Sequence, residues 1–175
     1  MSSHNGKHHP VRGAVAGVAG GLIASWVMNE FMTGPGKKIQ ESVEDPQQQN
    51  GQKSSEEETA TMKTADAIVE TVTGGQHLSH EGKQKGGVVV HYGYGALMGG
   101  LYGGLVEYWK APKAGLGTVF GSVLFGAGDL LAVPALNLGP SPTEQPASAQ
   151  TNPFLAHLVY GTTTELARRA VRAVL

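Results

Sequence analysis

The amino-acid sequence predicts an all-α protein, an integral membrane four-helix bundle with glycine-rich helix contacts and one additional amphipathic surface helix. The prediction starts from residues 86–109, which carry eight glycines and a single formal charge, Glu107. A helix of this length, rising 1.5 Å per residue, can cross a hydrocarbon layer of roughly 30 Å. Two further apolar, glycine-rich runs occur at 13–33 and 114–136, whereas the acidic residues concentrate between 37 and 85.

Composition limits the classes of function. The chain has 175 residues, which is one domain by length, and only 15 % of them are charged. Its mean hydropathy of -0.15 averages an acidic polar segment with an apolar remainder, so it does not indicate a soluble protein. The net charge of -1 provides no basic field, and no nucleic-acid partner is expected. The absence of cysteine excludes disulfides, thiol chemistry and cysteine-ligated metals.

Residues 1–12 predict a polar cytoplasmic tail. His4, His8 and His9 could bind a metal, but a solvated tail is the simpler interpretation, because three flexible histidines fix no geometry. The run 13–33 is expected to be the first transmembrane helix. Basic residues before an apolar run are also typical of a signal peptide, but this run is long and no small-residue cleavage motif follows it.

Residues 34–85 predict an extramembrane loop that contains an amphipathic helix over 56–73. Proline and the glutamine-rich run 47–53 favour disorder in its first part. Ser55 and Glu58 form a capping-box pattern, and Gly74 with Gly75 ends the helix. The apolar stripe is Met62, Ala65, Val69 and Val72. Because the polar face is not rich in lysine, we expect this helix to pack on the bundle rather than on lipid.

The second half of the chain predicts three more transmembrane helices. The helix over 86–109 ends in Tyr108 and Trp109, which suit a membrane interface, and Ser79 is a plausible N-cap for a start near residue 80. The third helix covers 114–136 and is followed by a proline-rich loop over 137–152. The fourth covers 153–175, with Asn152 as its expected cap and a basic cytoplasmic end.

The distribution of lysine and arginine predicts how the helices are oriented in the membrane. Lysine and arginine occur in the N-terminal tail, in the turn at 110–113 and at the C-terminus, and are absent from 137–152. The positive-inside rule therefore places both termini and the short turn in the cytoplasm. The six lysines of 34–85 disagree with this orientation, but long, acid-rich segments translocate largely regardless of charge.

Glycines at steps of four residues predict close helix contacts. A row of this kind forms a slanted groove in which another backbone can lie, and it suits right-handed crossings. The expected packing glycines are Gly13, Gly17, Gly21, Gly95, Gly99, Gly103, Gly117, Gly121 and Gly161. These faces exceed what a four-helix bundle needs, so the expected partners are the lipid bilayer and either further copies or a larger membrane complex.

Two groups of ionisable residues are candidate sites. A possible ion or proton cluster in the outer half comprises Asn29, Glu30, His91, Asp129 and His157. Such residues could bind a divalent metal or pass protons, but mutual pairing is the simpler interpretation because no compact ligand spacing occurs. Ion pairs at the cytoplasmic boundary are expected among Glu107, Glu165, Lys110, Arg168 and Arg169. No phosphate-binding loop or nucleophile elbow is present, so neither a cofactor nor a catalytic residue is expected.

The sequence also resembles the YagU-like bacterial inner-membrane family, a family of unknown function. The residues that carry the resemblance are His91-Tyr92, Gly95, Gly99, Tyr102-Gly103, Glu107, Asp129, Pro134, His157-x-x-Tyr160-Gly161, Glu165 and Arg168-Arg169, across about two thirds of the chain. The resemblance implies a protein of the bacterial inner membrane and assigns no reaction. We therefore expect a structural or accessory membrane subunit that packs through its glycine faces. The alternative is a small transporter or a proton- or metal-linked channel, and an enzyme is not expected.

Overall fold

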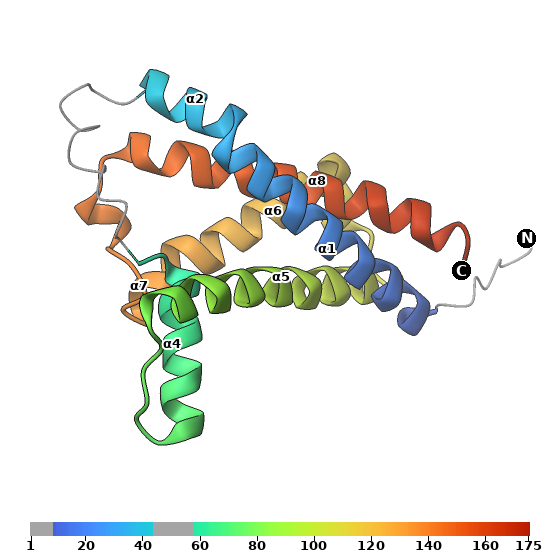
Figure 1. Ribbon diagram of the computed structural model, residues 1–175. Helices are drawn as coiled ribbons and strands as arrows, with labels where there is room; N and C mark the ends of the chain where they lie inside the picture. The colour runs from blue at the N-terminus through green and yellow to red at the C-terminus, as the bar shows by residue number, and fades with distance from the viewer. Residues whose placement is uncertain (1–8, 44–57) are drawn as a thin grey trace, which may run out of the picture.

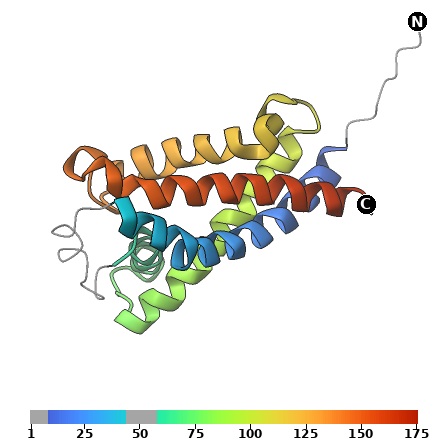
Figure 2. The ribbon, with the colours of Figure 1, turned by 90° about the horizontal axis from the view of Figure 1, so that it is seen from above.

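The computed structural model describes residues 9–43 and 58–175, and this part of the chain is helical and contains no strand. The prediction of an all-α fold is therefore confirmed. Four long segments run alternately in opposite directions (Figures 1 and 2). They are α1 (Pro10–Thr33), α5 (His80–Leu105), α6 (Thr118–Phe125) with its continuation, and α8 (Thr151–Arg172). The start of α1, the α5–α6 turn and the end of α8 lie at one end of the bundle, which we call the basic end.

Two helical segments are long and apolar enough to cross a membrane by length and composition, Pro10–Thr33 and Ala111–Ala135. Neither α5 nor α8 meets the same test among the described residues. Glycine and tyrosine lower the hydropathy of α5, and threonine and arginine lower that of α8. Four membrane-spanning helices thus remain a prediction, although the four-helix arrangement is present.

The helix α1 lies between α5 and α8. One side of α1 presents Gly13, Gly17 and Gly21 to α5, and the other side presents small residues to α8. A Cβ atom built on Gly20 would lie 2.8 Å from the carbonyl oxygen of Thr164, so α8 also approaches the α1 backbone closely. Small side chains on both sides of α1 allow it to be the central helix of the bundle.

The glycine rows lie inside the bundle. In the first seam, Gly13, Gly17 and Gly21 of α1 face Gly95, Gly99 and Gly103 of α5. In the second seam, Gly117 and Gly121 approach Gly161 of α8. A Cβ atom on Gly161 would lie 2.8 Å from the Gly121 nitrogen, well inside the normal contact distance of about 3.5–4.0 Å. Both seams therefore join helices of this chain, and these glycines do not form a free face for another chain.

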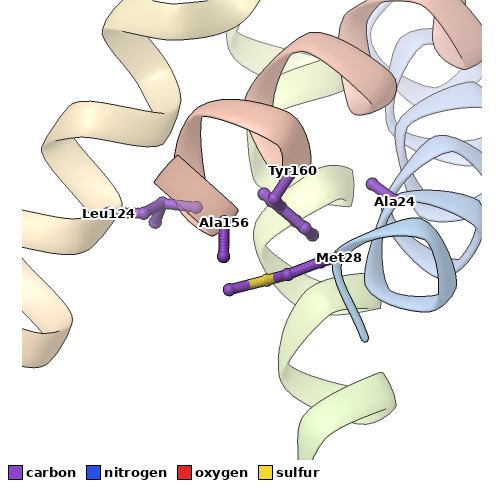
Figure 3. Close-up of a cluster of buried hydrophobic side chains, with 5 residues drawn as sticks. All are labelled: Ala24, Met28, Leu124, Ala156 and Tyr160. Atoms are coloured by element: carbon purple, nitrogen blue, oxygen red, sulfur yellow. The ribbon is translucent and has the colours of Figure 1, made fainter. Parts of the chain in front are cut away.

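The buried apolar cluster is small, as Figure 3 shows. It consists of Ala24, Met28, Leu124, Ala156 and Tyr160, from α1, α6 and α8. By contrast, large apolar side chains on the outside of the bundle are exposed. They include Val15, Leu22, Trp26, Val89, Leu97, Leu101, Val119, Val123 and Leu166. Small residues on the inside and large ones on the outside reverse the usual pattern of a soluble helical bundle.

The third long segment is irregular. After α6 the chain forms a π-helical turn, η2 (Gly126–Ala132), followed by the short α7 (Val133–Ala135). Pro134 explains the irregularity, because proline lacks an N–H group and its ring clashes with the carbonyl four residues earlier. A widened turn relieves that clash, and such bulges inside α-helices are frequent at functional sites. Before α6, the 3-10 segment η1 (Ala111–Gly117) has positive φ angles at Gly115, Leu116 and Gly117.

The segment between α1 and α5 differs from the expected loop. The helix α2 (Pro35–Val43) lies where the sequence predicts a disordered start of the loop, because Pro35 occupies the first turn of this helix, a position that proline favours. The helix α4 covers Ala60–Thr73, and Thr59 caps it by accepting a hydrogen bond from the Met62 N–H group at 3.3 Å. Ser55 and the run 47–53 lie outside the described residues. Glu58 forms no capping box and instead lies 2.8 Å from the Lys83 ammonium.

The helix α4 lies across the start of α5, and Figure 2 views it nearly end-on. A Cβ atom on Gly86 would lie 2.7 Å from the Ala65 Cβ, and one on Gly87 would lie 2.9 Å from the Met62 Cγ. The last residue of the predicted stripe, Val72, is 80 % exposed. The buried residues of α4, Met62 and Ala65, therefore lie in its first half.

The remaining boundaries shift by a few residues. The helix α1 begins at Pro10, inside the predicted tail, and α5 begins after Ser79, whose hydroxyl accepts a hydrogen bond from the Gly82 N–H group. The N-cap of α8 is Gln150 rather than Asn152. The Asn152 side chain instead donates a hydrogen bond to the Met32 carbonyl oxygen at 3.3 Å, which ties α8 to the end of α1.

Candidate functional site

The predicted ion or proton cluster is not assembled as a unit. Asn29 and Glu30 are exposed near the end of α1. His91 approaches the backbone instead, with its Nε2 atom 3.2 Å from the Ser25 carbonyl oxygen. Within 9–43 and 58–175, no three histidine or carboxylate side chains lie close enough together to hold a metal ion.

Two members of that predicted cluster do meet. The Nδ1 atom of His157 lies 3.7 Å from Asp129 Oδ2 and 2.9 Å from the Pro153 carbonyl oxygen. Asp129 lies on the π-helical turn η2 described above. The Phe125 ring lies 5.7 Å from the imidazole ring, and the Phe154 ring lies 5.3 Å from the Phe125 ring. Asp129 and His157 therefore form a partly buried carboxylate–imidazole pair, the only two members of the predicted cluster that lie within ion-pairing distance among the described residues.

A larger charged cluster lies toward the basic end. Its centre is Glu165 of α8, whose side chain is 0 % exposed. The Tyr102 hydroxyl donates to Glu165 Oε2 at 2.7 Å, and Arg168 donates to both oxygens at 2.9 and 3.2 Å. Arg169 Nε donates to Oε1 at 2.6 Å. Four hydrogen-bond donors therefore satisfy the buried carboxylate. These hydrogen bonds offset the free-energy cost of removing the charge from water.

Glu107 belongs to the same end but has a different partner from the one expected. Arg172 Nε donates to Glu107 Oε1 at 3.0 Å, and Arg172 Nη2 lies 3.5 Å from Oε2. Lys110, the predicted neighbour, is exposed in the turn. Sequence reasoning thus missed Arg172 and Tyr102. Tyr102 and Glu165 are 63 positions apart, so no local spacing could have indicated their contact.

The charged cluster borders an open cavity of about 440 Å³. Its lining residues are Glu107, Lys113, Arg168, Arg169, Arg172 and Ala173. Arg168 also lies with its guanidinium carbon 6.0 Å from the centre of the Tyr102 ring, a cation–π distance that fixes the arginine from the inside. The cavity is therefore a predominantly cationic site whose inner wall includes Arg168, which is paired with Glu165.

A family model described as "Protein of unknown function (DUF1440)" matches residues 37–166. No curated protein and no solved structure matches the chain. The match agrees with the prediction of an uncharacterised family. The YagU-like assignment and the bacterial inner membrane remain predictions.

Proposed function

We propose, from the premise that this chain belongs to the DUF1440 family of proteins of unknown function, that it is an integral membrane protein with a structural or accessory role. In this proposal α1, α5, the α6 segment and α8 cross the bilayer of a bacterial inner membrane. Both termini then lie in the cytoplasm, as the distribution of cations predicts.

The main support for this proposal is that large apolar side chains lie on the outside of the bundle and a charged side chain lies inside it. Trp26 is 56 % exposed and Leu97 is 58 % exposed, whereas Glu165 is fully buried. In water this arrangement would leave a large apolar surface uncovered and would bury charge at a cost. In a bilayer the same arrangement is favourable, because aliphatic side chains meet lipid and glycine contacts hold the helices together.

The less apolar helices fit the same proposal. The helix α8 contacts both α1 and the α6 segment, so Tyr160, Thr164 and Glu165 are buried inside the bundle. The Tyr160 hydroxyl donates to the Gly95 carbonyl oxygen at 2.6 Å, and the contact joins α8 to α5. Polar groups that face the protein interior do not have to be transferred into lipid, so α8 can cross with low hydropathy.

The glycine seams change the expected mode of assembly. Both seams are filled within the chain, so a partner subunit would contact the outer aliphatic faces rather than the glycine rows. An accessory role is favoured over catalysis because the buried carboxylate of Glu165 is already satisfied by four donors within the protein. The partner would be a further copy or a larger membrane complex.

Membrane extraction tests the proposal. After expression in bacteria, the protein should stay in the membrane pellet through an alkaline carbonate wash and should float with lipid in a density gradient. Release by carbonate without detergent would contradict the membrane assignment. Purification in mild detergent followed by light scattering tests the assembly, and a lone monomer would contradict the accessory role.

The Asp129–His157 pair supports a second candidate, proton-linked transport. The specific observation is that Asp129 lies on a π-helical turn within a segment long and apolar enough to cross a membrane. Vesicles that contain the protein and a pH-sensitive dye should then acidify under an inward proton gradient. Asp129→Asn should abolish the acidification, whereas Glu81→Gln, at the exposed start of α5, should not. Equal rates for both variants and for the unmodified protein would remove this candidate.

A further inference from the structure

The cavity at the basic end carries a surplus of positive charge. Its lining contains four cations, Lys113, Arg168, Arg169 and Arg172. Glu107 lies in the lining and Glu165 directly behind it, so two carboxylates face four cations, and the formal surplus is two positive charges. Inside or beside a membrane, cations without counterions are unfavourable, so this surplus predicts an anionic ligand.

The cavity also offers unused hydrogen-bond donors. Arg169 donates to Glu165 only through Nε, and its side chain is 49 % exposed, so its two Nη groups remain available. Lys113 has no carboxylate within ion-pairing distance among the described residues. A guanidinium fork beside an ammonium group is the donor set that proteins use for phosphate oxygens.

The position of the cavity indicates a lipid. Tyr108 and Trp109 are exposed at the same end, and such aromatic residues mark the headgroup level of a bilayer. Exposed apolar side chains, Leu116 and Leu166, lie three residues away from Lys113 and Arg169 on the same two elements. A ligand that combines a phosphate with acyl chains could therefore contact both the cations and the adjacent apolar surface.

We propose that this cavity binds the phosphate group of an anionic phospholipid at the cytoplasmic face of the membrane. The inference rests on the proposed membrane location. A volume of about 440 Å³ lies within the range of ligand sites, roughly 300–1,000 Å³, and holds a headgroup. The internal ion pairs with Glu165 keep Arg168 and Arg169 in place, so the site is preorganised before the lipid arrives.

Tryptophan quenching by brominated lipid provides the test. The chain has two tryptophans, Trp26 and Trp109, so the variant Trp26→Phe keeps only the one four positions before Lys113. The full-length Trp26→Phe protein is reconstituted in phosphatidylcholine vesicles that contain a small fraction of brominated phosphatidylglycerol. At equal fractions, we expect brominated phosphatidylglycerol to quench Trp109 several-fold more strongly than brominated phosphatidylcholine.

Two lysine variants form a matched pair. Lys113→Gln removes a charge that lines the cavity, and Lys110→Gln removes the same charge from the same turn but outside the cavity. A charge-assisted hydrogen bond to a phosphate oxygen contributes about 1.5 kcal/mol, roughly tenfold in affinity, so Lys113→Gln should remove most of the preference for phosphatidylglycerol. Lys110→Gln should leave the preference nearly unchanged.

Several results of these experiments would contradict the lipid site. Equal effects of the two lysine variants would show a general surface attraction and would overturn it, as would the absence of any lipid preference. Displacement of the brominated lipid by inorganic phosphate alone would assign the cavity to a free anion instead of a lipid. Flotation of the same vesicles keeps the two proposals distinguishable. Protein that does not float contradicts the membrane location, whereas protein that floats without a lipid preference contradicts only the lipid site.

Discussion

The α1–α5 seam can be tested by adding a single methyl group. Gly99 and Gly93 both lie inside α5, so alanine replaces glycine in the same helix at both positions. A Cβ atom on Gly99 would meet the Gly17 carbonyl oxygen and would lie 2.7 Å from the Gly21 Cα. A Cβ atom on Gly93 would have no heavy atom within 4 Å other than its chain neighbours and the nearby backbone of α5. The two variants therefore differ in packing and share the same chemical change.

The expected difference in melting temperature between Gly99→Ala and Gly93→Ala follows from their packing. Alanine favours a helix over glycine by about 1 kcal/mol, and this gain is common to both variants. Only Gly99→Ala must also separate two backbones, by roughly 1 Å, to reach a normal contact distance of about 3.5–4.0 Å. Overpacking of this kind costs about 1–3 kcal/mol, so Gly99→Ala should unfold about 3–10 °C below Gly93→Ala.

Thermal unfolding in mild detergent, followed by tryptophan fluorescence, measures the difference. The expected order of melting temperatures is Gly93→Ala at or above the unmodified protein, and Gly99→Ala clearly below both. Gly99→Ala melting together with Gly93→Ala would refute the close approach of α1 and α5. A reversible denaturation by sodium dodecyl sulfate provides an independent measure of the same free energy.

Three further predictions concern the donors to Glu165, the contact of α4 with α5, and the membrane topology. Tyr102→Phe removes a donor from the buried carboxylate and should lower the free energy of unfolding by about 1.5–3 kcal/mol, measured by the same denaturation. The hydrogen bond from the Leu78 N–H group, followed by that from the Lys83 ammonium, lowers the pKa of Asp66 to about 2, below its ordinary 3.8. The contact of α4 with α5 should thus hold above about pH 4 and weaken as the pH falls through 2, as hydrogen exchange of α4 would show. Because the chain has no cysteine, Gly139→Cys and Ala173→Cys should react with an impermeant thiol reagent from opposite sides of the membrane.

The sequence predicts the helices well because their signal is local. A run with a single charge such as 86–109 has few alternatives to a helix, and rows such as Gly95, Gly99 and Gly103 indicate that a backbone must approach there. The same rows do not specify which backbone approaches. A glycine groove can accept the backbone of any helix, so the sequence could not distinguish a contact within the chain from one between chains.

The candidate sites are harder to predict because they depend on how helices are rotated and shifted against one another. Glu30 and His91 both lie on predicted helices, but the structure exposes one and turns the other toward the Ser25 carbonyl oxygen. Asp129 reaches His157 after the helix widens at η2, and the position of a π-helical turn does not follow from apolar periodicity. Only a proline five positions later, Pro134, gives a local signal for it.

The glycine seams and the charged cluster depend on each other. Gly117 has a φ angle of 90°, and a Cβ atom there would lie 3.1 Å from the Glu165 Cβ. The missing side chain lets the turn before α6 close over Glu165, and closure removes the carboxylate from water. An enclosed carboxylate needs hydrogen-bond donors from the protein, and here Arg168 and Arg169 donate to it. The second seam therefore also positions the arginines that line the cavity, because a wider contact would admit water and release them.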